Sequence, residues 1–561
     1  MKQQSIITFS SWRFYLVGFV ILAIVAGLVV RIIELAVTER HFLQGQGDAR
    51  SLRVLNESAF RGMITDRNGY PLAISASVFS IWINPEEFVI NPSSLNNLAT
   101  LLGMKSKDIQ MMLERNKTRK REFVYLKRQI PPPVAKQIKS LKIPGVYLQQ
   151  DYKRFYPEGE VAGHVIGFTN IDDQGQEGLE LAYNDWLSGV SGKRMVIKDR
   201  TGRVVDNLRE LKEEKPGHDL VLSINRQIQY LAYRELLDAV KKNLAPSGSA
   251  VVLDIKTGEI LAMVNQPSFN PNNMRGQKKD NFRNRAVTDI FEPGSTMKTF
   301  SMATALESGK YTPETMVDTT PGWIHVGNHT IHDEHLKGLI SLTQILQFSS
   351  NVGMTKVILT LPPDRLWNLL HRIGFGEVTE AGFPGEQAGK LVNRPVWKPL
   401  ALATLSFGYG ISVTALQLAH AYATIANDGI KVPLSLIRVE NPPVGVRVVD
   451  EKIAHQMLEM LQSVLQKGGT GQAARVPGYT VAGKTGTAWI SVNKSYQKHR
   501  YTSSFVGIAP ATHPRLVVAV VIHDPQGKQF YGGDVSGPAF QKIMEGSLRF
   551  LNIPPDAPVS Q

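Results

Sequence analysis

The most informative stretch of the sequence is Phe291-Glu292-Pro293-Gly294-Ser295-Thr296-Met297-Lys298. Ser295 and Lys298 are three positions apart, so on a helix they lie on the same face, one turn from each other. Pro293-Gly294 is a suitable helix start, which would place the serine hydroxyl near the positive end of the helix dipole. A serine hydroxyl is a weak nucleophile without an adjacent base, and a partly desolvated lysine can be that base. The stretch therefore predicts nucleophilic catalysis by Ser295, with Lys298 as the base.

The same serine–lysine spacing occurs at two other places, and their context argues against both. Ser491/Lys494 and Ser495/Lys498 fall in a predicted polar, charged loop after a strand, where a lysine stays solvated and cationic. Only Ser295/Lys298 lies in an apolar context that opens a helix. The sequence thus singles out one of the three pairs.

Two further motifs follow in order along the chain. Ser349-Ser350-Asn351 precedes an apolar helical run, 54 positions after Ser295, and Lys484-Thr485-Gly486 begins 133 positions after Asn351. The Lys-Thr-Gly triplet lies within or beside a predicted strand, Tyr479–Ile490, whose edge amides and lysine can meet a ligand carboxylate. An earlier Lys-Thr-Gly, at 256–258, is typical of a hairpin turn, where glycine supplies the backbone angle. Each short motif alone is expected to occur by chance, but the occurrence of all three in this order is not.

Together these three motifs resemble the active-site motifs of penicillin-binding proteins and serine β-lactamases. Other segments resemble the pedestal signatures of class B, monofunctional penicillin-binding proteins. They are Arg61–Gly69 (RGMITDRNG), Arg154–Pro157 (RFYP) leading to Gly163–Gly167 (GHVIG), and Gly175–Glu180 (GQEGLE) with Tyr183. The resemblance covers nearly the whole chain. It implies a D,D-transpeptidase that forms 4→3 cross-links between peptidoglycan stem peptides through a serine acyl-enzyme.

The resemblance also implies a role for each motif residue. Ser295 would attack the carbonyl between the two terminal D-alanines of a stem peptide, Lys298 would take its proton, and Ser349 would relay a proton to the leaving amine. Asn351 would hold Lys298 and the substrate amide. Substrate binding would fall to Lys484, Thr485, Gly486 and Thr487. The backbone N–H groups of Ser295 and Thr487 would form the oxyanion hole. The scheme needs no cofactor and no metal, and β-lactams would acylate the same serine.

Pattern and resemblance predict an α+β chain with a membrane anchor, a strand-rich elongated pedestal, and a catalytic domain built as an antiparallel sheet with helices. Phe14 to Val30 carries no charge over 17 residues, which favours an uncleaved signal anchor. The catalytic domain follows the charged segment Arg209–Lys215. Strands are predicted at both of its sequence ends, among them Ala250–Asp254, Glu259–Val264 and Leu516–Ile522, with about 200 residues of largely helical pattern between the two groups. The predicted divisions are a cytoplasmic tail at 1–13, a transmembrane segment at 14–33, a pedestal at 34–215, a transpeptidase domain at 216–550 and a C-terminal tail at 551–561.

The middle motif bears on the biological role. Ser349-Ser350-Asn351-Val352-Gly353 resembles the septal branch of class B enzymes, whereas elongation-specific relatives typically carry Ser-x-Asp there. A class A β-lactamase would place an E-x-x-L-N stretch between Asn351 and Lys484, and the sequence has none. The alternatives are an elongation-specific transpeptidase, a D,D-carboxypeptidase, a β-lactam-sensing receptor or a scaffolding component.

The septal resemblance implies a location and partners. The protein would be a single-pass inner-membrane protein enriched at the division septum, with its catalytic domain in the periplasm. Its partners would be stem peptides as donor and acceptor, β-lactams as inhibitors, the septal glycosyltransferase of the SEDS family (FtsW), and the divisome proteins FtsQ, FtsL, FtsB and FtsN.

Composition narrows the chemistry further. The 561 residues include no cysteine, which excludes disulfides, thiolate catalysis and Cys-ligated zinc. A formal net charge of +14 suits anionic cell-wall precursors and lipid headgroups. The basic run Lys105 to Arg128 lacks a nucleic-acid motif and predicts a solvated helical face, so no nucleic acid is expected as a partner.

Four histidines and one aspartate form a cluster whose spacing could suit a zinc ion. Glycines surround the cluster, so the sequence favours a hairpin-like loop with polar histidines over a metal site. The cluster is His325, His329, His332, Asp333 and His335.

Overall fold

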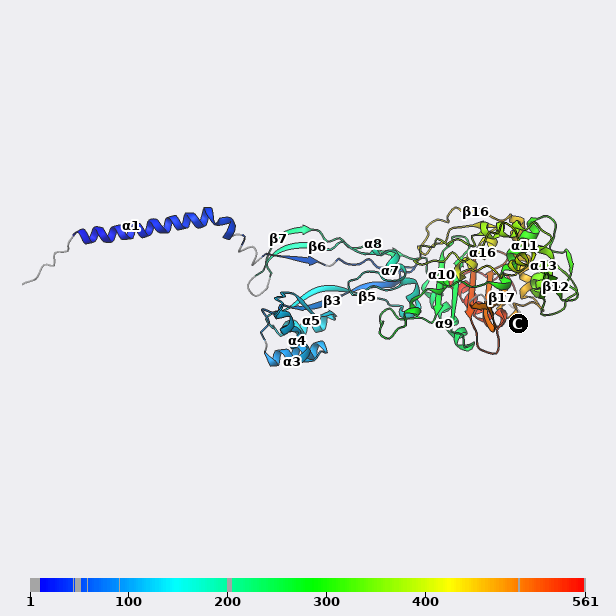
Figure 1. The fold of residues 1–561 in the computed structure, drawn as a ribbon, viewed down its shortest axis with the longest axis horizontal. Helices are drawn as coiled ribbons and strands as arrows, with labels where there is room; N and C mark the ends of the chain where they lie inside the picture. Colours follow the sequence, from blue (N-terminus) through cyan, green and yellow to red (C-terminus); the bar gives the residue numbers. More distant parts are fainter. Residues whose placement is uncertain are drawn as a thin grey trace, which may run out of the picture. The chain divides into compact units, whose positions relative to one another are not determined.

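The computed structural model describes residues 11–43, 45, 52–57, 59–89, 91–198, 204–492 and 495–558. They form two compact units, and both contain helices and strands, as the α+β prediction requires (Figure 1). Unit 1 comprises 1–59, 78–151 and 190–215, and unit 2 comprises 60–77, 152–189 and 216–561. The predicted tails at 1–13 and 551–561 lie partly outside the described residues, and the domain boundaries stay predictions.

Helix α1, Ser11–Ile33, contains the whole predicted membrane segment 14–33 (Figure 1). A π-helical turn, Glu34–Thr38, continues it. Among the described residues, Trp12–Thr38 is the one helix long and apolar enough to cross a membrane. Its large apolar side chains are exposed, so the rest of the described chain does not cover them. The helix fits a single-pass membrane anchor.

Besides α1 and its π-helical turn, unit 1 contains two groups of strands and the three helices α3, α4 and α5. Strands β1 (Leu52–Glu57), β6 (Gly192–Lys198) and β7 (Val204–Lys212) form an antiparallel sheet in the order β1-β6-β7. In the second group β3 (Pro71–Ile83) pairs with both β4 (Val124–Ile130) and β5 (Val146–Phe155). The helices are α3 (Pro92–Leu102), α4 (Ser106–Lys117) and α5 (Pro132–Ser140). They share a core with the second group that includes Ile81, Leu98 and Ile109.

The basic run from Lys105 to Arg128 covers α4, the turn after it and the first part of β4. Ile109 and Leu113 of α4 face the core, while the lysines and arginines of the run are exposed, apart from a half-buried Arg128. This confirms the prediction of a solvated helical face.

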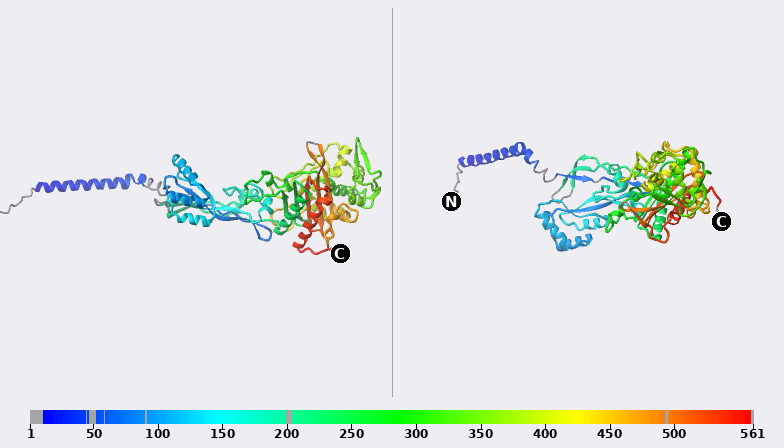
Figure 2. Two further views of the ribbon diagram at one scale, coloured as in Figure 1. Left: turned by 90° about the horizontal axis from the view of Figure 1, so that it is seen from below. Right: turned by 45° about the vertical axis from the view of Figure 1, so that its right-hand side comes forward.

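Unit 2 is organised around a five-stranded antiparallel sheet. Its strands, in spatial order, are β10 (Ile260–Gln266), β9 (Ser247–Asp254), β19 (Leu516–His523), β18 (Ser495–Ala509) and β17 (Ala482–Val492). Strands predicted at the two sequence ends of the unit thus pair side by side, and Figure 2 shows the red C-terminal part beside the green strands. Every residue of β10 is buried, so helices cover the sheet on both faces.

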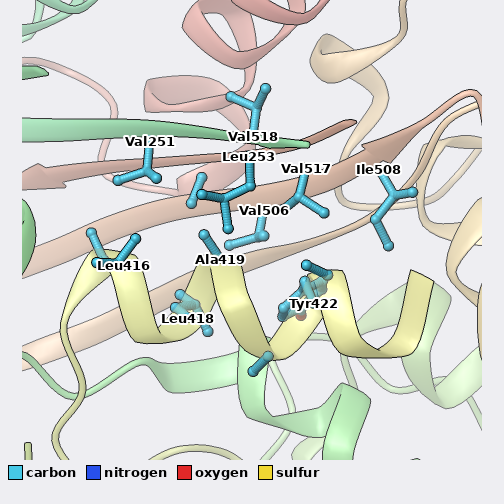
Figure 3. Close-up of a cluster of buried hydrophobic side chains, with 14 of the residues drawn as sticks. Val251, Leu253, Leu416, Leu418, Ala419, Tyr422, Val506, Ile508, Val517 and Val518 are labelled. Atoms are coloured by element: carbon cyan, nitrogen blue, oxygen red, sulfur yellow. The ribbon is translucent and has the colours of Figure 1, made fainter. Parts of the chain in front are cut away.

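Two pairs of helices pack on this sheet. Helices α9 (Arg226–Lys242) and α19 (Gly537–Phe550) contact each other and strands β9, β10 and β19. Helices α16 (Ala415–Ala426) and α17 (Glu451–Gln462) contact each other and strands β9, β17, β18 and β19. In Figure 3, Leu416, Ala419 and Tyr422 of α16 lie with sheet residues such as Leu253 and Val506 in one apolar cluster. Helix α17 also contacts α11 (Lys298–Glu307).

The residues between β10 and β17 are less uniformly helical than the sequence pattern predicts. Besides α16 and α17, their longer helices are α11 (Lys298–Glu307), α12 (Leu342–Phe348), α13 (Asn351–Ile358), α14 (Asp364–Ile373) and α15 (Pro399–Ser406). Three small two-stranded sheets interrupt them: β11 (Met316–Asp318) with β14 (Leu339–Ser341), β12 (Trp323–Val326) with β13 (His329–His332), and β15 (Ile430–Lys431) with β16 (Val446–Arg447).

A fully buried ion cluster joins three of the segments that resemble pedestal signatures. Glu180 accepts hydrogen bonds from Arg61 Nε at 2.7 Å and from Arg154 Nε at 2.6 Å. The side chain of Glu180 is 0% exposed and those of both arginines are 1% exposed. All three residues belong to unit 2. One carboxylate therefore compensates two guanidinium groups that have lost their hydration.

Replacing Glu180 with alanine is expected to lower the free energy of unfolding of unit 2 by about 3–5 kcal/mol, because both guanidinium groups lose their charge partner while buried. Denaturant unfolding of the chain measures the loss. Glu451→Ala is the control, since its carboxylate meets Arg447 on the surface with 59% and 45% of the two side chains exposed. A loss for E180A as small as that for E451A would contradict the prediction.

Candidate active site

Ser295 lies on a tight turn directly before α11. Gly294–Met297 forms a 3₁₀ turn and the α-helix begins at Lys298, so the predicted helix start at Pro293-Gly294 is tighter than an α-helix. Gly294 has φ +57°, and a Cβ atom there would lie 2.9 Å from the carbonyl oxygen of Thr487 on β17. Glycine is thus required for the serine turn to approach strand β17.

Lys298 is the buried centre of the site. Its side chain points from the first residue of α11 and the residue is 0% exposed. The Nζ atom lies 2.9 Å from Ser295 Oγ, 2.7 Å from the carbonyl oxygen of Ser349, 3.2 Å from Ser349 Oγ and 2.7 Å from Asn351 Oδ1. The first and second motifs are therefore joined through one amine.

The protonation state of Lys298 follows from this environment. Burial lowers its pKa from the ordinary 10.5 to about 7, against the opposing charges of Asp333 and Glu334. A neutral amine has two N–H donors and one lone pair. The Ser349 carbonyl and Asn351 Oδ1 can only accept, so they use the two N–H groups, and the lone pair is left for the hydroxyl proton of Ser295. In its neutral form Lys298 is thus placed to act as a base toward Ser295.

The second motif occupies the junction between α12 and α13. Ser349 ends α12 in the left-handed conformation, at φ +60°, and Ser350 caps α13 by accepting a hydrogen bond from the backbone N–H of Gly353 at 2.8 Å. A non-glycine residue in this conformation stores strain, and such residues gather at functional sites. The junction turns both the carbonyl and the hydroxyl of Ser349 toward Lys298.

The third motif lies on β17, an edge strand of the sheet. Lys484 is 0% exposed, and its Nζ lies 3.1 Å from Ser349 Oγ. Burial and the charge of Lys298 hold the pKa of Lys484 well below its usual range. A Cβ atom at Gly486 would lie 2.8 Å from the carbonyl oxygen of Pro293, so glycine again permits the close approach. Ser349 Oγ therefore bridges the two lysines of the site.

The two threonines of the third motif are fixed by neighbours. Thr485 shares a hydrogen bond with Thr470 Oγ1 at 2.8 Å, and its carbonyl and hydroxyl lie 3.5 Å and 3.4 Å from Lys484 Nζ. Thr487 Oγ1 accepts from the backbone N–H of Gly532 at 3.0 Å. The structure thus brings all eight predicted site residues together at one edge of the sheet.

The alternative motifs fall elsewhere. Lys256-Thr257-Gly258 is the turn between β9 and β10, with Gly258 at φ +71°, as predicted. Ser491 lies on β17, Lys494 is outside the described residues, and Ser495 opens β18. The prediction of a loop here is wrong for Ser491 and Ser495, because β17 and β18 stay paired out to these residues. The histidine cluster forms the predicted hairpin, β12–β13.

Two residues that build the site carried no usable sequence signal. Tyr422 is buried on α16, and its hydroxyl donates to the carbonyl oxygen of Thr296 at 2.8 Å while sharing a hydrogen bond with Thr299 Oγ1 at 2.7 Å. Tyr422 thereby fixes the turn that carries Ser295. Asp333, weighed in the sequence only as a metal ligand, contacts the second motif instead. Neither spacing nor composition connects these residues to the motifs, because both contacts are long-range.

Removing the Tyr422 hydroxyl in Tyr422→Phe is expected to lower the free energy of unfolding by about 1–2 kcal/mol, since the buried Thr296 carbonyl loses its partner. Thermal or denaturant unfolding measures the change. The matched control is Tyr311→Phe, whose hydroxyl bonds Thr360 Oγ1 in an exposed setting at 2.7 Å and should matter less. Equal losses in the two variants would refute the expectation.

Ser295 Oγ lies 2.9 Å from the amine of the buried Lys298, and a second serine–lysine contact and an edge strand lie beside this pair. This is the arrangement of a serine acyltransferase. Comparison with known families makes the assignment specific. Residues 248–545 match the penicillin-binding protein transpeptidase domain, and residues 56–222 match the penicillin-binding protein dimerisation domain. The chain therefore belongs to the class B penicillin-binding proteins.

Similarity to individual relatives extends over the full length. The chain is 45% identical over 549 residues to the probable peptidoglycan D,D-transpeptidase PbpC of Pseudomonas aeruginosa, covering 97% of this chain and 96% of that one. It is 43% identical over 561 residues to the peptidoglycan D,D-transpeptidase FtsI of Escherichia coli, covering 99% and 95%. The solved transpeptidase domain of Burkholderia pseudomallei penicillin-binding protein 3 is 42% identical with a TM-score of 0.56, covering 60% of this chain and 98% of that one.

Proposed function

We propose that this protein is a serine D,D-transpeptidase that cross-links peptidoglycan stem peptides, and that β-lactams inhibit it by acylating Ser295. The observation that supports this most directly is the contact of Lys298 Nζ with Ser295 Oγ at 2.9 Å inside a buried site. The names of the full-length relatives agree with it.

In the proposed acylation, neutral Lys298 takes the hydroxyl proton as Ser295 Oγ attacks the carbonyl between the two terminal D-alanines. The backbone N–H groups of Ser295 and Thr487 stabilise the oxyanion. The proton then reaches the leaving D-alanine amine through Ser349, whose hydroxyl is within reach of both lysines. Expulsion of D-alanine leaves an ester between Ser295 and the stem peptide.

Substrate binding falls to the third motif. The terminal carboxylate of the stem would lie against Lys484, Thr485 and Thr487, with Gly486 keeping the strand close to the serine turn. An arriving carboxylate favours the charged form of Lys484, which offsets the burial that otherwise lowers its pKa. Asn351 would hold the substrate amide in addition to Lys298.

In the second half of the reaction, the amine of a neighbouring stem attacks the ester carbonyl and gives up a proton through Ser349 to neutral Lys298. Lys298 then returns this proton to Ser295 Oγ as the ester bond breaks. The new amide is the cross-link. Water in place of the amine would give a D,D-carboxypeptidase.

Purified full-length protein given lipid-linked glycan with stem-peptide acceptors should form cross-linked dimers, whereas release of D-alanine without dimers would favour the carboxypeptidase.

We propose further that the cross-linking takes place at the division septum. The Ser349–Gly353 segment and the relatives named FtsI support this role over elongation. The protein would be anchored in the inner membrane by α1 with its catalytic domain in the periplasm. It would work with the SEDS glycosyltransferase FtsW and with FtsQ, FtsL, FtsB and FtsN.

Depletion of the protein tests the septal role. Cells should continue to elongate and form filaments, while spherical cells would indicate elongation duty. A reporter active only in the periplasm, fused at the C-terminus, tests the topology; the same reporter must stay inactive when fused ahead of residue 11.

A further inference from the structure

A carboxylate outside the eight motif residues contacts the second motif directly. Asp333 follows β13 and is half-buried. Its Oδ1 accepts hydrogen bonds from the backbone N–H groups of Asn351 at 2.5 Å and Val352 at 2.9 Å. Its Oδ2 accepts from Ser350 Oγ at 2.5 Å. A single carboxylate thus uses both oxygens on the first turn of α13.

These contacts tie the start of α13 to the end of the β12–β13 hairpin. The carbonyl oxygen of His332 accepts a hydrogen bond from Asn351 Nδ2 at 3.2 Å, which directs Asn351 Oδ1 toward Lys298 Nζ. Backbone and side chain of Asn351 are therefore both held by the hairpin. The negative charge of Asp333 also lies at the positive end of the helix, where it is stabilising.

The residue before this anchored turn is the strained one. Ser349 has φ +60°, a conformation that costs free energy for a residue with a side chain and persists only when the surroundings hold it. Asp333 holds Asn351 and Val352, which follow Ser349 in the chain. The last turn of α12 precedes Ser349. Without the anchor, the Ser349 carbonyl and hydroxyl lose their fixed position against Lys298.

We propose that Asp333 is a positioning residue for acylation, which holds Ser349 and Asn351 in place against Lys298 through the first turn of α13. The proposal rests on the proposed acyl transfer at Ser295. It assigns to Asp333 a role in the geometry of the site, with no contact to substrate.

Asp333 also has an electrostatic effect that a purely structural residue would lack. Burial lowers the pKa of Lys298, and the charges of Asp333 and Glu334 oppose that shift. Lys484, across Ser349 Oγ, is the other titratable group that faces Lys298. Removing a negative charge must therefore lower the pKa of Lys298 further, so that the neutral base is present at lower pH.

Two substitutions separate these effects. In Asp333→Asn the remaining oxygen can still accept from both backbone N–H groups, and Ser350 Oγ can accept from the new amide, so the geometry stays while the charge is lost. In Asp333→Ala all three hydrogen bonds are lost. Glu334→Gln is the matched control, because it removes a neighbouring charge without touching the hydrogen bonds of Asp333.

The experiment measures the acylation rate of the full-length protein at saturating fluorescent penicillin between about pH 5 and pH 9. D333A should lower the high-pH plateau by about 10- to 100-fold, the cost of a small misplacement of catalytic groups. D333N and E334Q should keep the plateau within a few-fold and move the rising limb to lower pH. Thermal unfolding of each variant reports the folded fraction.

The proposal is overturned if D333A retains the wild-type plateau, or if its plateau falls only in proportion to the folded fraction. Should D333A not fold, Asp333→Ser decides, because one short hydroxyl cannot replace both carboxylate oxygens toward Asn351, Val352 and Ser350: a wild-type plateau in D333S overturns the proposal. Absence of labelling of the wild type, or labelling that survives Ser295→Ala, would instead contradict the acyl transfer at Ser295, so the two failures are distinguishable.

Discussion

Replacing Ser295 with alanine is expected to abolish covalent labelling of the protein by a β-lactam. No other hydroxyl in the described chain combines the contact to Lys298 Nζ at 2.9 Å with a place on a turn against β17. Loss of a nucleophile typically costs on the order of 10⁶-fold in rate. Gel fluorescence after incubation with a labelled penicillin measures the effect, and the folded state is checked by thermal unfolding.

Ser491→Ala is the control for this substitution. It removes the serine of an alternative serine–lysine spacing on an exposed part of β17, and labelling should stay at the wild-type level. Stable labelling of the S295A protein, or its loss in S491A, would place the nucleophile elsewhere.

Replacing Lys298 with alanine is expected to lower the acylation rate by about 10²- to 10⁴-fold, the usual contribution of a general base. Acylation needs the neutral amine, and the pKa of Lys298 is about 7 because of burial. The wild-type rate should therefore rise as the pH increases through about 7 and level off above it. In K298A that rise should disappear.

Stopped-flow or quenched labelling across this pH range measures both effects. The control is Lys256→Ala, which removes the lysine of the hairpin Lys-Thr-Gly, a half-exposed side chain that bonds Asn427 Oδ1 at 3.1 Å. K256A should keep the wild-type rate and pH profile. A K298A protein whose rate still rises near neutral pH would show that another group is the base.

The catalytic motifs were predictable because they are local. Two residues three positions apart on a helix meet wherever the helix lies, so Ser295 and Lys298 are linked by spacing alone. The strands β9, β10 and β19 were predictable because their apolar runs are short and bounded by turn signals. The uncharged run at 14–30 likewise predicts α1 through its length and composition.

Details that depend on close tertiary contacts were not predictable from local sequence patterns. The 3₁₀ turn at Ser295 arises where the chain passes close to β17. Strand β11 pairs with β14 across the β12–β13 hairpin that lies between them in the chain. Tertiary contacts override weak local preferences at such places. The left-handed Ser349 is a further case, since nothing in a serine predicts a positive φ.

By itself, the sequence predicted Ser295 as the nucleophile, Lys298 as the base and Lys484-Thr485-Gly486 as the strand motif, because these predictions depend on residue type and on short spacing. Tertiary structure alone decided how the three motifs meet at Lys298 and Ser349 Oγ, and that Asp333 and Tyr422 support them. The physical reason is that burial and long-range hydrogen bonds set both the position and the pKa of the amine. Those terms exist only once segments far apart in the chain have packed together.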